Sequence, residues 1–189
     1  MQPANVPLCL IPGTTHRSVL RVMQPQFEYR PVTAIAASAP VRLTVPGHGL
    51  PAESWHCWLT RVQQMPELNR EPLRQLPHRV TVVDDDTLEI NRISATGQQP
   101  RGGELVYQPP VDLAGVEVVM RVFDKAGGAV LLELSLGDGL EIVGPGTIER
   151  VISADRVIPP TAAWYWVEVR YPDGTEHRYW QGSVTLGNA

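Results

Sequence analysis

Frequent interruption by proline and glycine is the feature that most limits what this chain can fold into. The 189 residues include 18 prolines and 16 glycines, spread along the whole sequence. Proline removes a backbone donor and clashes inside a helix, and glycine weakens helices because it loses more conformational freedom on folding. Helical periodicity is weak and confined to residues 67–76 and 153–158, where only a turn or two is expected. The sequence leaves little room for a long helix.

Short segments rich in Val, Ile, Thr and aromatic residues fill the stretches between these breaks. Each is bounded by Gly, Pro, Asp or Asn, and several alternate apolar with polar residues, as a half-buried strand does. Many short strands separated by turn residues are typical of an all-β sandwich or barrel. The expected strands are residues 41–45, 55–62, 78–83, 87–93, 116–123, 129–136, 140–143, 147–153, 164–171 and 177–186. We therefore predict an all-β fold.

Composition and charge argue against several classes of function. Hydrophobic residues make up 43% of the chain, enough for packed cores, and charged residues at 19% are too few for a disordered chain. The net charge of −4 lacks the basic footprint of a nucleic-acid-binding protein. No apolar run approaches the roughly 20 residues that span a bilayer, and no basic stretch followed by an apolar one opens the chain. We expect no nucleic-acid partner, no membrane insertion and no signal peptide.

Three consecutive aspartates, Asp84 to Asp86, lie between the β-branched segments 78–83 and 87–93. Aspartate is favoured in tight turns because its side chain bonds nearby backbone N–H groups. A calcium loop needs ligands at alternating positions, a central glycine and a distal glutamate, which this segment does not supply. Adjacent carboxylates on an extended chain diverge, so they do not form an acid–base pair. We therefore expect a hairpin turn here.

Other residues give little support for metal binding or catalysis. His48, His56, His78 and Cys57 could in principle gather around zinc. His48 lies in a turn, however, and the neighbours His56 and Cys57 point to opposite faces of a strand. The chain has no GxSxG motif and no phosphate-binding glycine loop, and Cys9 and Cys57 lack CxxC spacing. We expect no metal, no cofactor and no catalytic residue.

The last expected hairpin has an unusually aromatic second face. Tyr165 and Val167 share the face expected to be core, so Trp164 and Trp166 project from the other. We expect Tyr179 of the second strand close to the two tryptophans. Because exposed aromatic side chains commonly anchor interfaces, Trp164, Trp166 and Tyr179 form a candidate protein-contact surface. In the alternative register, the tryptophans lie in the core and Tyr165 faces outward.

Three motifs occur together between residues 32 and 107: "APVRLTVPGHGLP", "MPELNR" and "HRVTVVDDDTLEINRISATG". Their combination resembles a small β-module of bacteriophage tail proteins, often labelled after the first catalytic-cysteine half-domain of ubiquitin-activating enzymes. That family has a Met-x-x-(Ile/Leu)-Asn segment, which Met65, Leu68 and Asn69 match. A Val-rich strand and an acidic turn follow in the family, and Asp84 to Leu88 match the turn.

The flanking sequence carries a second set of motifs: "VDLAG", "LLEL", "TIERVIS" and a closing hairpin that ends in "GSVTL". This set resembles a β-sandwich of phage tail, baseplate and fibre-attachment proteins, in which the chain before "VDL" supplies the first strand. The prolines in "YRPVT" and "LVYQPP" mark points where a paired strand would hardly continue. We therefore expect an immunoglobulin-like β-sandwich made of residues 1–31 and 108–189, with a small β-barrel-like module inserted at 32–107.

Together the resemblances imply a structural component of a bacteriophage virion, not an enzyme. The chain would be a tail-tip, baseplate or fibre-adaptor subunit that acts through protein–protein contacts. Its partners would be other tail, baseplate or fibre proteins and further copies of itself in the particle. It would be made in the cytoplasm of the host bacterium and then form part of the virion tail. The family label implies no ubiquitin chemistry, and Cys57 matches no catalytic position of the motif.

Two other functions are compatible with parts of the sequence. A receptor-binding module of the tail could stack exposed aromatic side chains on a host-surface saccharide or protein. A hydrolase of a surface polymer would need paired acids in a groove. The pairs that the sequence offers are Glu53 with Glu67 and Asp138 with Glu141. Nothing in their setting distinguishes them from solvated loop charges.

Overall fold

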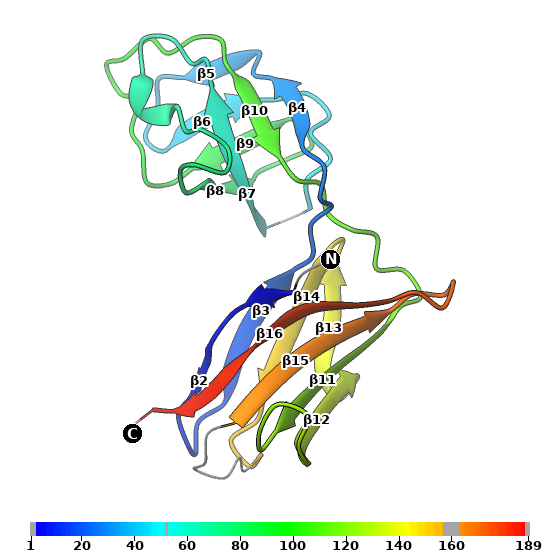
Figure 1. Ribbon diagram of the computed structural model, residues 1–189. Helices are drawn as coiled ribbons and strands as arrows, with labels where there is room; N and C mark the ends of the chain where they lie inside the picture. The colour runs from blue at the N-terminus through cyan, green and yellow to red at the C-terminus, as the bar shows by residue number, and fades with distance from the viewer. Residues whose placement is uncertain (1–2, 52, 157–162, 188–189) are drawn as a thin grey trace. The chain divides into compact units, whose positions relative to one another are not determined.

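Strands make up almost all of the regular structure of this chain. A computed structural model describes residues 3–51, 53–156 and 163–187 (Figure 1). The one helical element in these residues is the 3-10 turn η1 (Pro66–Leu68). None of the described helical structure has the length and apolar character needed to cross a membrane. The predicted all-β class is therefore confirmed.

The chain forms two compact units, and one is inserted in the sequence of the other. Met1–Val22 and Asp112–Ala189 make up the larger unit, and Met23–Val111 make up the inserted unit. The sheets of the two units share no strand. The predicted insertion of one β unit within another is therefore confirmed.

The inserted unit extends beyond the expected range of 32–107 at both ends. Strand β4 (Glu28–Pro31) pairs antiparallel with β10 (Glu104–Tyr107), so the incoming and outgoing chains lie side by side. A further bridge joins Met23 to Pro110. The inserted unit begins earlier in the sequence than expected because β4 pairs with β10, a strand of that unit. The sequence of β4 gave no sign of this, since its residues show no alternation of buried apolar side chains.

The larger unit is one strongly curled sheet of nine strands (Figure 1). Its order is β1-β16-β15-β11-β12-β13-β14-β3, and β2 also pairs with β16. The bounds are β1 (Ala4–Asn5), β2 (Leu8–Leu10), β3 (His16–Arg21), β11 (Glu117–Phe123), β12 (Val130–Leu136), β13 (Gly139–Gly144), β14 (Thr147–Ile152), β15 (Ala163–Arg170) and β16 (Glu176–Leu186). Neighbours distant in sequence, such as β11 and β15, give this unit its cohesion.

Alternation along the central strands builds the core of the larger unit. In β11, Val118, Met120 and Val122 are buried, and the residues between them are more exposed. In β15, the residues that pair with these three are Val169, Val167 and Tyr165, and they are buried as well. Full burial of one such side chain contributes about 1.5–3 kcal/mol. The hydrophobic pattern thus fixes which face of each strand is the core.

The inserted unit is a second curled sheet with its own core. Its seven strands follow the order β4-β10-β7-β8-β9-β6-β5. The remaining bounds are β5 (Ala34–Ala36), β6 (Val41–Thr44), β7 (Glu53–Thr60), β8 (His78–Val82) and β9 (Thr87–Ile90). Trp55 is fully buried there, and its indole N–H donates to the carbonyl of Gln108 at 2.9 Å.

The "MPELNR" motif has a structural role in the inserted unit. Met65 and Leu68 are both fully buried in its core. Asn69 accepts a hydrogen bond from the Val62 N–H at 2.8 Å and donates to the Val62 carbonyl at 2.9 Å. The amide therefore pairs with the backbone as a neighbouring strand would, and it holds the loop against the sheet.

Removal of the inserted unit should leave the larger unit folded. We expect a variant in which a short Gly-Ser linker replaces residues 24–110 to unfold in one cooperative transition, because each unit buries its own core. Circular dichroism during urea unfolding would measure this. A variant that lacks only 33–106 is the matched comparison, and it should be less soluble because β4 loses β10. Absence of a cooperative transition in the first variant would contradict the division into units.

Candidate functional site

The register of β15 decides which face of the last hairpin is available for contacts. Tyr165, Val167 and Val169 have no exposed surface, so they are core residues. Trp164 and Trp166 alternate with them and therefore lie on the opposite face, where both are half-buried. The expected register is confirmed, and the alternative with both tryptophans in the core is wrong.

Trp166 is the centre of an aromatic cluster on this face. Its ring centroid lies 3.9 Å from that of Phe123, with the ring planes inclined at 32°. The guanidinium carbon of Arg178 lies over the Trp166 ring, 4.1 Å from its centroid, in a cation–π contact. The Trp166 indole N–H is buried without a hydrogen-bond partner among the described residues. A buried donor without a partner costs the fold stability, and because it has no exposed surface it does not itself face a partner molecule.

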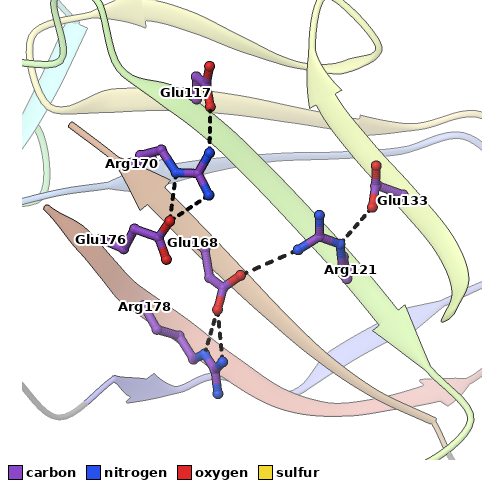
Figure 2. A network of polar contacts seen from close by, with 7 residues as sticks. All are labelled: Glu117, Arg121, Glu133, Glu168, Arg170, Glu176 and Arg178. Carbon is purple, nitrogen blue, oxygen red and sulfur yellow. Dashed lines mark hydrogen bonds and ion pairs between the residues drawn. The ribbon is translucent and has the colours of Figure 1, made fainter. Parts of the chain in front are cut away.

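A ladder of ion pairs covers the rest of the face (Figure 2). Arg121 lies directly opposite Trp166 in the register, which puts the ladder and the tryptophans on one side of the sheet. It binds Glu133 at 2.6 Å and Glu168 at 3.5 Å, and Glu168 in turn accepts from Arg178 at 2.8 Å. The cross-strand pairs thus run continuously from β12 through β11 and β15 to β16 (Figure 2).

A second group of ion pairs lies beside the first. Arg170 binds Glu176 at 2.5 Å and Glu117 at 3.5 Å (Figure 2). We call Phe123, Trp164, Trp166 and the seven charged residues of Figure 2 the aromatic–ionic face. Exposed ion pairs contribute about 0–1 kcal/mol each, so the ladder adds little to stability. Its effect is to hold charged groups in fixed positions around an aromatic centre, as the polar rim of an interface does.

Tyr179 does not join the tryptophans. The β15–β16 register places Val167 opposite Trp180 but Glu168 opposite Arg178, so Tyr179 is the extra residue of a β-bulge. The bulge reverses the alternation of β16. The Tyr179 hydroxyl lies 2.7 Å from that of Tyr171, and its ring packs against His177, which pairs with core-facing Val169. Of the three expected contact residues, the structure brings together only Trp164 and Trp166.

Asp84 to Asp86 form the turn between β8 and β9, as predicted. The Asp84 carboxylate accepts from the Asp86 N–H at 2.9 Å, and this bond holds the pKa of Asp84 below its ordinary value. The Asp86 carboxylate accepts from the N–H of Gly47 at 2.8 Å. The aspartates therefore bond backbone groups of their own turn and of the neighbouring loop.

The turn should tolerate loss of its charge. We expect the triple variant Asp84→Asn, Asp85→Gly, Asp86→Asn to keep the fold, because asparagine oxygens accept the same two backbone bonds. Zinc or calcium should leave the melting temperature of the wild-type chain nearly unchanged, since only a specific ligand stabilises the native state by mass action. Thermal unfolding with and without each ion measures this. A rise of several degrees with either ion would revive the metal hypothesis.

The residues of the zinc hypothesis are engaged in the fold. His48 accepts from the Leu50 N–H at 3.0 Å, and its other ring nitrogen lies 2.9 Å from the Asp84 carbonyl. His78 is buried and bonds the carbonyl of Leu68 at 2.9 Å. Cys57 is fully buried, and burial raises the pKa of its thiol. Among the described residues, no three His, Cys, Asp or Glu side chains gather as a metal site would require.

His78 should make the stability of the inserted unit depend on pH. Burial lowers the pKa of its imidazole below the ordinary value of 6.5, with a smaller contribution from Arg70. Below pH 6.5 the unfolded chain therefore binds more protons than the folded chain, and stability falls as the pH drops toward the folded pKa. We expect a His78→Gln variant, which can still donate to Leu68, to lose less stability over this range. Thermal unfolding at a series of pH values measures the slope, and equal slopes would contradict the assignment.

Several members of the aromatic–ionic face were not among the expected site residues. Phe123, Arg121 and Glu133 come from β11 and β12, whose pairing with the hairpin is not visible in its own sequence. Alternation of 116–123 was the available signal, since it puts Arg121 and Phe123 on the side opposite the buried valines. The ion pairs between strands, in contrast, could be recognised only once it was known which strands lie next to one another.

Comparison with known proteins adds no family to these observations. No protein-family model matches the chain, and no curated protein matches it in sequence. The role of the chain is therefore inferred from its own residues and their geometry.

Proposed function

We propose that the chain is a structural component of a bacteriophage virion, a tail-tip, baseplate or fibre-adaptor subunit that acts through protein–protein contacts. One observation carries the proposal. The two sequence resemblances require a small β unit inserted in a larger one, and the chain has this organisation. The paired strands β4 and β10 supply adjacent entry and exit points, as an insertion needs.

The finer fold class is part of the same proposal. We assign the larger unit to the immunoglobulin-like β-sandwiches, and its nine strands in one strongly curled sheet support this assignment. The inserted unit corresponds to a small barrel-like module, which seven strands and one enclosed core support. Both are architectures in which the sheet supplies a rigid platform and its outer face is free for contacts.

The aromatic–ionic face is the contact surface that this function would use. Aromatic anchors surrounded by polar groups carry much of the binding energy in protein interfaces. Trp164 and Trp166 are half-buried on this face, and Arg121, Glu168 and Arg178 are positioned around Trp166. A carbohydrate platform at Trp166 has less support, because the guanidinium of Arg178 already occupies the ring face on which a sugar would stack.

A photo-crosslinking experiment in purified particles tests the proposal. Ser183 lies opposite Trp164 in the sheet, so a photoreactive amino acid at Ser183 would report neighbours of the aromatic–ionic face. A photoreactive amino acid at Val143, an exposed residue of β13, is the matched control. We expect mass spectrometry to find the chain in the particles and a tail-protein crosslink from position 183 but not from 143. Absence of the chain from the particles would overturn the proposed role in the virion.

A further inference from the structure

A groove in the inserted unit lies where strands β8 and β9 stop pairing. The two strands pair only at Thr81–Glu89 and Val82–Leu88 among the described residues. Regular continuation would place Arg79 opposite Asn91, but the ladder has already ended there. A groove of about 770 Å³ occupies this position and is lined by residues of both strands and of the loop before β8. It is larger than a second hollow of the same unit, of about 450 Å³, which is lined by Thr60, Arg61 and Glu71 among others.

The groove is basic. Arg70, Arg79 and Arg92 line it, and no aspartate or glutamate lines it among the side chains that the structure describes. Arg70 is committed to the loop, since it donates to the carbonyls of Leu76 and Pro77 at 2.8 and 3.0 Å. Arg79 donates from Nε to the Ser54 hydroxyl at 3.1 Å, which uses one of its three nitrogens. Arg92 is exposed. Two guanidinium groups are therefore placed to receive an anion.

Apolar side chains at the rim of the groove indicate which kind of anion the groove would bind. Leu76 is 83% exposed and lines the groove together with Pro77 and Ile93. No Trp, Tyr or Phe lines it among the described residues, so it lacks the aromatic platform on which saccharides usually stack. An inorganic anion would gain nothing from an exposed leucine. The combination fits a peptide that carries both carboxylates and apolar side chains.

We propose that this groove binds an extended acidic segment of a partner protein, whose carboxylates meet Arg79 and Arg92 and whose apolar side chains cover Leu76. Guanidinium groups bind carboxylates through two parallel hydrogen bonds, which makes arginine the suited residue for this contact. An extended peptide also matches the place where the β8–β9 ladder opens, because peptides commonly dock alongside strands. The site belongs to the inserted unit and does not involve the aromatic–ionic face.

Binding of a labelled probe peptide tests the proposal. The probe is a ten-residue peptide of alternating Asp and Leu, and the comparison peptide has Lys in place of Asp. We expect fluorescence anisotropy to show binding of the acidic probe alone, with affinity that falls as salt rises, because exposed charge pairs are screened. The double variant Arg79→Gln/Arg92→Gln should bind the probe at least about tenfold more weakly.

The matched control is the double variant Arg74→Gln/Lys125→Gln. It loses the same charge from two exposed residues that do not line the groove, and it should bind the probe as the wild type does. Circular dichroism would verify that each variant is folded. Failure of the probe to bind at low salt would overturn the proposal, as would equal binding by the Arg79 and Arg92 variant. A polygalacturonate that binds where the peptide does not would show that the ligand is an anionic saccharide instead.

Discussion

Replacement of Trp164 and Trp166 together by serine is expected to leave the chain folded but to abolish its association with other subunits. Both side chains are half-buried on the face opposite the core residues of β15. The fold loses one aromatic pair, Trp166 with Phe123, and one cation–π contact with Arg178. Contacts of these kinds contribute about 0.5–1.5 and about 0.5–1 kcal/mol. These two contacts account for about 1–2.5 kcal/mol of the free energy of unfolding, and the apolar area that the two half-buried rings cover adds to the loss.

Association should suffer far more than stability. Truncation of a central aromatic anchor typically costs about 2 kcal/mol or more of binding energy, and here two neighbouring anchors are lost at once. Sedimentation velocity at increasing protein concentration measures self-association. Recovery of the variant in purified particles measures assembly with other proteins.

A core variant of similar stability separates the two effects. Val118→Ala removes two buried carbon atoms of β11 and should cost about 2 kcal/mol, but it leaves the aromatic–ionic face intact. We expect this variant to associate as the wild type does. If both variants lose association equally, reduced stability explains the result. If the tryptophan variant associates normally, the face is not the contact surface.

Local patterns in the sequence were sufficient for the features that depend on neighbouring residues. The register of β15 followed from Tyr165, Val167 and Val169, because a strand has only two faces and these apolar residues share one. The turn at Asp84 to Asp86 followed from the preference of aspartate for backbone N–H groups. The turn is decided within a few residues of the chain, whereas the sequence favoured one register of β15 and left the reverse one open until the burial of Tyr165 excluded it.

Features that depend on a distant strand could not be predicted in the same way. Tyr179 does not lie where the sequence predicted it, because β16 has a bulge opposite Val167 and Glu168. Close packing of Gly182 against the backbone of Val6, where a side chain would clash, also constrains this part of β16. Strand β4 likewise has no apolar alternation and is a strand only because β10 pairs with it. Such pairings are decided by tertiary structure, which a period-two pattern does not contain.

Arg150 is a residue whose importance appears only when its surroundings are known. It lies on β14 between the core residues Ile148 and Ile152 and is 4% exposed. Its Nε donates to the Ser18 hydroxyl at 3.0 Å, and its guanidinium lies over the ring of Tyr165, 5.5 Å from the centroid. No carboxylate pairs with it among the described residues, and burial lowers the pKa of the guanidinium. The core of the larger unit thus contains a charge held by neutral groups.

An Arg150→Glu variant is expected to destabilise the larger unit by at least about 3 kcal/mol, because it places a buried carboxylate where the fold holds a buried guanidinium. Arg150→Met should instead give stability equal to or higher than that of the wild type, since methionine fills similar space without a desolvated charge. Urea unfolding, followed by hydrogen exchange of the β14 amides, assigns the change to this unit.

Val151→Glu is the matched control, because it places the same carboxylate on the opposite, half-exposed face of the same strand and should cost within about 1 kcal/mol. A loss of several kcal/mol in Arg150→Met would show that the contacts with Ser18 and Tyr165 outweigh the cost of burying the charge.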